Sequence, residues 1–424
     1  MSTLQPVDGP AVADSRGEFS KGWKPLFAGM MGVATGASPI PFNVLPIVIG
    51  PIHLAMGWSF TQVSIGVTIY GILGALLAPA VGGLADRVGV KPVALASLAA
   101  FGAAFSLLFF TPQNIYGYYA LWALVGLVGI GSTPVTWSRG INMWFYKHRG
   151  LALGILLLGT SIAGMVVPQI ANGVLEAAGW RYVFPAMALL PLLVGLPIAF
   201  FMFREPTRDE RPAALEDETG ALTGMTVTEA VRGYRFWMLW FSVVAIALAY
   251  GGAHIHMVQI VQFHGFSTAA AAGVMGVVAS GIFAGRIIVG VLFDRFWAPG
   301  VAFPVLVMPV IACYLLLGTD TSAAPIYLAG FLLGFAAGAE SDVIAYLASR
   351  YFGMLAYGRI YGFLYMPFGI FASISPVLYG YTRDVTGSYD QMLIIAMGLF
   401  LIGGTLLLTL GRYPDWTRAK GTQA

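Results

Sequence analysis

The sequence predicts an all-α integral membrane protein whose twelve transmembrane helices form two six-helix bundles. Composition, the number of apolar runs and an internal repeat support this prediction. Of the 424 residues, 58% are hydrophobic and 10% are charged, whereas a soluble domain carries about 25% charged residues. The mean hydropathy is +0.80. So much apolar surface must face the lipid bilayer.

Twelve apolar runs are long enough to cross a membrane, because a helix needs about 20 residues to span a hydrocarbon core of about 30 Å. These runs, named spans 1 to 12, are 24–50, 60–82, 91–111, 116–143, 150–174, 182–203, 236–262, 268–293, 299–318, 324–349, 358–380 and 389–411.

Lysine and arginine orient the spans because they accumulate in cytoplasmic loops. With a cytoplasmic N-terminus, 18 of the 22 Lys and Arg residues lie inside and two, Arg181 and Arg383, lie outside. Arg139 and Arg286 fall in or near the membrane. We therefore expect a protein of the cytoplasmic (inner) membrane with both termini in the cytoplasm.

The longest polar stretch separates spans 6 and 7 and divides the chain in two. We expect it to be a flexible linker, with a regulatory site as the alternative. The predicted organisation is a cytoplasmic tail (1–23), an N-terminal bundle (24–203), a linker (204–235), a C-terminal bundle (236–411) and a second tail (412–424). We expect the monomer to be functional.

Several classes of function are excluded by the sequence. The charges lie at segment ends, so no nucleic-acid footprint is visible. A single cysteine, Cys313, excludes a disulfide framework within the chain, and the five histidines lack metal-binding spacing. No GxxxxGK[ST] motif supports ATP hydrolysis. We expect no catalytic centre, metal or cofactor, and no enzyme activity.

An internal repeat relates the loops after spans 2 and 8 at an offset of 208 residues. Its four matched pairs are Gly82 and Gly290, Leu84 and Leu292, Asp86 and Asp294, and Arg87 and Arg295. Parallel halves of this kind place substrate between them near mid-membrane. An aspartate here can accept hydrogen bonds from helix N-termini or arginines at an inner gate. We expect gating by Asp86, Arg87, Asp294 and Arg295, with a purely structural loop as the alternative.

Two stretches resemble known transporters. GGLADRVGVKP, from Gly82, resembles the cytoplasmic signature of the major facilitator superfamily, although Val90 replaces a usual basic residue. The stretch from Asn142 to Phe184, with LALG and GWR, resembles spans 4–5 of monocarboxylate porters and bacterial relatives, including oxalate/formate antiporters. The resemblance implies the two-bundle major facilitator fold and transport of organic anions.

Arg286 in span 8 is the main candidate for substrate binding. It precedes Asp294 by eight residues, which is about 12 Å along a helix. An arginine this deep is costly unless it faces water or an anion, and its guanidinium can hold a carboxylate through two hydrogen bonds. The alternative is an internal ion pair with Glu340 or Asp342. Its counterpart in the first half is Ala78, and in monocarboxylate porters the arginine of span 8 binds the carboxylate.

Proton coupling has a separate set of candidates. Several monocarboxylate porters carry an aspartate one turn before this arginine, where this chain has Ile282. Some carry a lysine in span 1, near which an ungapped comparison places Asn43, and Asn43 is therefore a candidate for substrate binding. Glu340 and Asp342 in span 10 are membrane-embedded carboxylates and therefore candidate proton carriers, with Glu340 preferred because it is deeper. The alternative is a structural ion pair with Arg350 or Arg139.

Other polar residues are weaker candidates for the substrate site. His254 can titrate near neutral pH and is therefore also a candidate for proton coupling, and Tyr250 lies one turn away on the same face. Thr133 in span 4 can donate to substrate, although hydroxyls also bond back to helix carbonyls. Tyr361 and Tyr365 share a face of span 11, and Arg139 is expected at the inner gate.

These features predict a secondary transporter that moves a small organic monocarboxylate with a proton by alternating access. A single buried cation favours one carboxylate over two. The alternatives are an organic anion exchanger of the oxalate/formate type, an exporter of apolar compounds and a non-transporting sensor or scaffold. The expected partners are a small carboxylate, protons and the lipid bilayer.

Overall fold

The computed structural model describes residues 15–217, 221–317 and 322–414. The outer parts of both predicted tails, 1–14 and 415–424, lie outside the described residues. The described parts of the chain are almost entirely helical, with two isolated β-bridges and no strand.

Every predicted span of the first half is helical. Spans 2, 3 and 5 follow the prediction closely, whereas spans 1, 4 and 6 are each built from more than one helical segment. The helices are α1 (Ser15–Ala34) and α2 (Ile40–Met56) for span 1, α3 (Phe60–Val88), α4 (Val90–Leu107), α5 (Ile115–Gly129) and α6 (Pro134–Asn142) for span 4, α7 (Arg149–Ala178), and α8 (Trp180–Leu189) and α9 (Leu196–Met202) for span 6. A π-helical turn, η3 (Leu190–Gly195), joins α8 to α9.

The second half follows a short linker helix, α10 (Val227–Arg232), and within the described residues only its first span is built from more than one helical segment. Its helices are α11 (Tyr234–Ile255) and α12 (Met257–Phe263) for span 7, α13 (Thr268–Arg295), α14 (Ala298–Leu315), α15 (Ala323–Phe352), α16 (Tyr357–Thr386) and α17 (Asp390–Leu408). In the described parts of the chain, 11 helical segments are long and apolar enough to cross a membrane, and Ile40–Met56 is a shorter apolar helix. With α2 completing span 1, the twelve-helix prediction is confirmed.

The breaks in spans 1 and 4 lie against each other. The break in span 1 contains Pro39, and the break in span 4 ends at Pro134. Helical backbone is disfavoured at a residue that precedes proline. The Ala37 N–H donates to Ser132 Oγ over 3.0 Å, and the Tyr70 hydroxyl donates to the Ala37 carbonyl. The backbone groups released by one break are therefore satisfied partly by the other.

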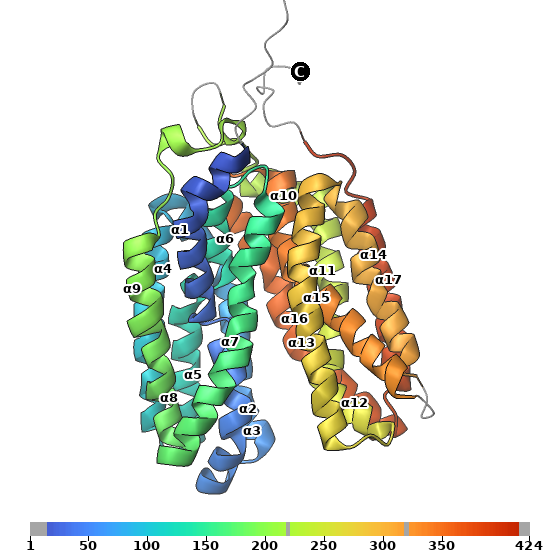
Figure 1. Cartoon of the computed structure of the whole chain (residues 1–424). Coiled ribbons are helices and arrows are strands. Elements are labelled where there is room, and N and C mark those ends of the chain that lie inside the picture. The colour runs from blue at the N-terminus through green and yellow to red at the C-terminus, as the bar shows by residue number, and fades with distance from the viewer. Residues whose placement is uncertain (1–14, 218–220, 318–321, 415–424) are drawn as a thin grey trace, which may run out of the picture.

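The two halves lie side by side and approach each other most closely at the end that carries the linker, here called the linker end (Figure 1). α3 packs against α16, and α7 packs against α13. Glycines permit this approach: a Cβ on Gly82 would overlap the Gly358 carbonyl, and one on Gly150 would overlap the Gly290 carbonyl. Because Gly82 and Gly290, and likewise Gly150 and Gly358, are 208 residues apart, both contacts are copies of one arrangement.

Two segments expected to be loose are docked at the linker end. α1 begins at Ser15, well before the predicted start of span 1, and Glu18 accepts the N–H groups of Tyr146, Lys147 and His148. The linker pairs with the end of α15, where Thr223 accepts the Met354 N–H over 2.8 Å. The part of the linker around Thr223 is therefore attached to the second half.

Candidate functional site

The linker end is closed by two equivalent helix caps that cross between the halves. Asp294 in α13 accepts the N–H groups of Gly150 and Leu151 over 2.6 and 2.9 Å. Asp86 in α3 accepts those of Gly358 and Arg359, both over 2.9 Å. A carboxylate at a helix N-terminus satisfies unpaired N–H groups and interacts favourably with the helix dipole. Each half thus caps a helix of the other half through the same repeated residue.

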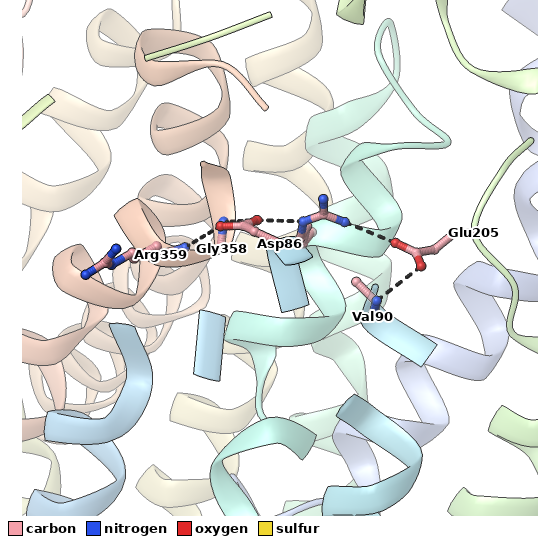
Figure 2. A network of polar contacts seen from close by, with 6 residues as sticks. Asp86, Val90, Glu205, Gly358 and Arg359 are labelled. Carbon is pink, nitrogen blue, oxygen red and sulfur yellow. Dashed lines mark hydrogen bonds and ion pairs between the residues drawn. The ribbon is translucent and has the colours of Figure 1, made fainter. Parts of the chain in front are cut away.

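The Asp86 cap carries an additional network (Figure 2). Arg139 Nε donates to Asp86 over 2.7 Å, and its Nη1 donates to Glu205 over 3.0 Å. Glu205 also accepts the Val90 N–H at the start of α4. Arg139 therefore lies at the linker end, as expected for a gate residue, and joins α3 to the start of the linker.

Arg87 and Arg295, the other two predicted gate residues, are exposed beside these caps. Their side chains take no part in the two cap contacts of the aspartates. A gating role for either arginine stays a prediction.

Arg286 lies on α13 directly beside the first half. A Cβ on Gly154 of α7 would come 2.5 Å from the Arg286 carbonyl oxygen, and a Cβ on Gly362 would come 2.5 Å from the Ala78 carbonyl oxygen. These contacts are again copies 208 residues apart, so the backbone arrangement is duplicated and the side chain is not. Only the second half has a guanidinium at this point.

The glycine-rich packing of α13 on α15 brings two carboxylates near this arginine. A Cβ on Gly285 would overlap the Phe335 carbonyl, and one on Gly338 would overlap the Ile282 carbonyl. Small residues allow such close approach between membrane helices. The packing sets the position of Arg286 relative to Glu340 and Asp342.

The three charged residues are buried, with exposed fractions of 7% for Arg286, 4% for Glu340 and 1% for Asp342. Within the described residues, Arg286 forms no ion pair within 4.0 Å. Its Nε and Nη1 atoms, both Asp342 oxygens and Glu340 Oε1 have no hydrogen-bond partner there. Asp342 is nonetheless close enough to Arg286 to interact electrostatically, and its Oδ2 would lie 3.6 Å from a Cβ on Gly154. The close ion pair considered above is therefore absent from the described structure.

Aromatic candidates gather around these charges. The Tyr250 hydroxyl and His254 Nδ1 are 3.0 Å apart, as their one-turn spacing predicts. Tyr361 and Tyr365 stack edge to face with ring centroids 6.0 Å apart. Tyr250 and Tyr365 are close enough to Glu340 to interact with it electrostatically, and Tyr361 is close enough to Asp342 to do the same. The structure thus brings the predicted residues of spans 7, 8, 10 and 11 together.

The two candidates of the first half make local contacts instead. Thr133 Oγ1 donates to the Ile130 carbonyl over 2.7 Å, and Asn43 Nδ2 donates to the Pro39 carbonyl over 2.8 Å. Thr133 therefore has only its acceptor capacity left for a substrate, whereas Asn43 keeps one amide N–H and its carbonyl oxygen. The substrate roles of both residues stay predictions. The described residues contain no cluster of three or more His, Cys, Asp or Glu able to hold a metal.

Arg149 is a buried charge that the sequence did not single out. Arg149 is one of the 18 Lys and Arg residues expected in cytoplasmic segments, yet only 1% of its surface is exposed. Its guanidinium donates to the carbonyls of Phe145 and Asn142 and, over 3.0 Å, to Ser349 Oγ in the second half. Only the packing of α15 against α7 reveals this burial.

Known proteins share this architecture. The uncharacterized MFS-type transporter YcxA of Bacillus subtilis (strain 168) is 23% identical over 369 residues, covering 85% of this chain and 88% of the relative. Monocarboxylate transporter 11 of Homo sapiens is 23% identical over 356 residues, covering 78% of this chain and 70% of the relative. The crystal structure of the human organic anion transporter MFSD10 (TETRAN) superposes with a TM-score of 0.71 at 15% identity, covering 91% of this chain and 99% of that chain.

The fold and these likenesses define a multi-pass membrane transporter. A model of the Major Facilitator Superfamily matches residues 31–376. The chain belongs to that superfamily, whose members are transporters and not enzymes.

Proposed function

We propose that this protein carries small organic monocarboxylates together with a proton by alternating access. Arg286 carries the proposal: it is a buried arginine in the middle of a membrane helix, beside the other half, with no ion pair among the described residues. Its unpaired N–H groups can hold one carboxylate through charge-assisted hydrogen bonds. The Homo sapiens relative named above is called a monocarboxylate transporter, which agrees with this substrate class.

Charge balance links the anion to a proton. With Asp342 ionised, its charge balances that of Arg286, and a second carboxylate entering the site leaves one buried negative charge uncompensated. Burying an unpaired charge is costly, so protonation of Asp342 accompanies anion binding. The sequence favoured Glu340 for this role, whereas proximity to Arg286 favours Asp342; Glu340 lies nearer the aromatic residues Tyr250 and Tyr365.

Tyr250, His254, Tyr361 and Tyr365 supply aromatic surface around the charges. Their hydroxyl and imidazole groups can donate to a second substrate oxygen, and their rings limit its size. The distribution of Lys and Arg favours a cytoplasmic position for the linker end, which would make the present conformation one that is closed toward the cytoplasm.

Uptake by proteoliposomes tests the proposal. We expect wild-type protein to accumulate labelled monocarboxylates faster under an inward proton gradient. We expect Arg286→Ala to lose uptake by about 30- to 150-fold, since a buried charge-assisted contact contributes about 2–3 kcal/mol. Arg286→Lys should recover part of the rate, and Arg232→Gln, at an exposed position on α10, should match wild type. Normal carboxylate uptake by Arg286→Ala would contradict the assignment. Counterflow that is insensitive to the gradient would indicate an anion exchanger instead.

A further inference from the structure

Four buried polar atoms lack a hydrogen-bond partner within the described residues where α6 of the first half packs against α16 of the second half. They are Ser138 Oγ, both polar side-chain atoms of Asn142 and the Tyr361 hydroxyl. All three residues have an exposed fraction of 0%. A buried polar group without a partner is costly, and alanine, leucine or phenylalanine would avoid that cost at these positions. The closed conformation therefore gives no reason for these polar side chains.

The residues of the two helices face each other. Ser138 and Asn142 are one turn apart on one face of α6, and Tyr357 and Tyr361 are one turn apart on one face of α16. The two tyrosine rings have centroids 5.6 Å apart. Tyr357 lies close to the side chains of Ser138 and Asn142, and Tyr361 lies close to Ser138, although the Tyr357 hydroxyl donates instead to the Ala345 carbonyl over 3.2 Å. Ser138, Asn142 and Tyr361 are here called the polar row.

The polar row extends from the central site to the linker end. At one end, Tyr361 is close enough to Asp342 of the central site to interact with it electrostatically. At the other end, the Asn142 carbonyl accepts Arg149 Nη2 over 3.4 Å. Asp86 and Arg149, which carry opposite charges, are both close enough to the neighbouring tyrosine of α16 to interact with it. The row therefore joins the central site to the gate and contains only uncharged polar groups.

We propose that the polar row is a release site for the carboxylate, formed when the linker end opens. Opening separates α6 from α16, because the two helices belong to different halves, and exposes the unpartnered atoms beside the central site. An asparagine side chain has two N–H donors and each hydroxyl has one, so the row can hold a carboxylate. Uncharged donors hold it more weakly than a guanidinium does, which suits an anion that is leaving Arg286. The inference rests on the carboxylate transport proposed above.

A cysteine reporter of opening tests the proposal in the full-length, detergent-solubilised protein. Ser349 is 3% exposed and accepts a hydrogen bond from Arg149 of the other half, so Ser349→Cys reacts with maleimide when the halves separate. Arg286→Ala is combined with the reporter to remove the central site. Because a ligand shifts a population toward the state it binds, we expect propionate to accelerate labelling, by about threefold at twice its Kd. Chloride at matched ionic strength should not accelerate it.

Variants of the two helices distinguish the polar row from its surroundings. Asn142→Leu should abolish the acceleration by propionate, and Tyr361→Phe, which removes only a hydroxyl, should weaken it. Thr136→Val is the matched control, because Thr136 Oγ1 also lacks a partner within the described residues. Thr136 lies one turn before Gly140, where a Cβ would meet Phe203 of the first half, so it faces away from α16. This variant should keep the full acceleration.

Three outcomes overturn the proposal. They are no acceleration by propionate in the Arg286→Ala background, acceleration only when Arg286 is present, and equal acceleration in Asn142→Leu. Failure of the proposed transport function appears separately, as normal carboxylate uptake by Arg286→Ala. The two results are independent, since the labelling assay measures binding outside the central site.

Discussion

The Gly290–Gly150 contact makes the closed linker end sensitive to a single methyl group. A Cβ on Gly290 would lie 2.7 Å from the Gly150 carbonyl oxygen and 3.2 Å from the Leu151 Cα, whereas ordinary contacts are 3.4–4 Å. Both neighbours are backbone atoms, so α7 and α13 must separate by several tenths of an ångström. Overpacking of this kind costs about 1–3 kcal/mol. The higher helix propensity of alanine acts equally in every conformation and cancels from the conformational equilibrium.

We therefore expect Gly290→Ala to favour opening of the linker end by about 5- to 150-fold, the factor that corresponds to 1–3 kcal/mol. The assay is maleimide labelling of a Ser138→Cys reporter, since Ser138 is buried on α6, which packs against α16 of the other half. The native Cys313 is buried, so background labelling is low. Gly276→Ala on the same helix meets no atom within 4 Å and is the matched control. Equal labelling rates in the two alanine variants would refute the reasoning.

Two further predictions concern carboxylates at the linker end. Asp86→Asn should lower the thermal unfolding temperature more than Asp294→Asn, because it also leaves the buried Arg139 without one of its two charged partners. Breaking a buried ion pair costs about 3–5 kcal/mol. Equal decreases in the unfolding temperature of the two variants would contradict this prediction. The Arg204 guanidinium lowers the pKa of Glu210 to about 2. The Glu210 carboxylate is therefore ionised and in contact with Arg204 between pH 5 and 8, and this contact is lost only as the pH falls toward 2. Glu210→Gln should therefore leave the pH profile of uptake between pH 5 and 8 unchanged, whereas Asp342→Asn should remove its proton dependence; a flattened profile in Glu210→Gln would show that the linker carboxylate takes part in coupling.

The sequence predicted the equivalence of the two gate aspartates. The 208-residue repeat identified Asp86 and Asp294 as equivalent, and the structure shows them making equivalent contacts. The groups they cap, beginning at Gly150 and Gly358, are separated by the same offset. A search of the repeat for paired glycines at helix starts would have found both caps.

Other features depend on packing that no local pattern reveals. Arg149 follows a lysine and a histidine and has the local sequence of an ordinary loop arginine, but contact with Ser349 places it in the interior. The Asp86 network includes Glu205, which belongs to the polar stretch after span 6 and was assigned to the linker. The breaks in spans 1 and 4 do have a local signal, because Gly, Ser or Thr precede Pro39 and Pro134, yet apolar character alone favoured continuous helices.

The two halves of the repeat differ at the positions of the buried carboxylates of span 10. The counterparts of Glu340 and Asp342, 208 residues earlier, are Ser132 and Pro134, which lie at the break in span 4. The second half therefore places carboxylates in an unbroken helix where the first half interrupts the helix. We expect Pro134→Ala to change kcat by altering the conformational step while leaving KM for the anion within about twofold, and Arg286→Lys to raise KM, because a contact to substrate is weakened. Uptake measured over a range of substrate concentrations separates the two effects. A KM increase in Pro134→Ala as large as that in Arg286→Lys would show that the break in span 4 contacts the substrate itself.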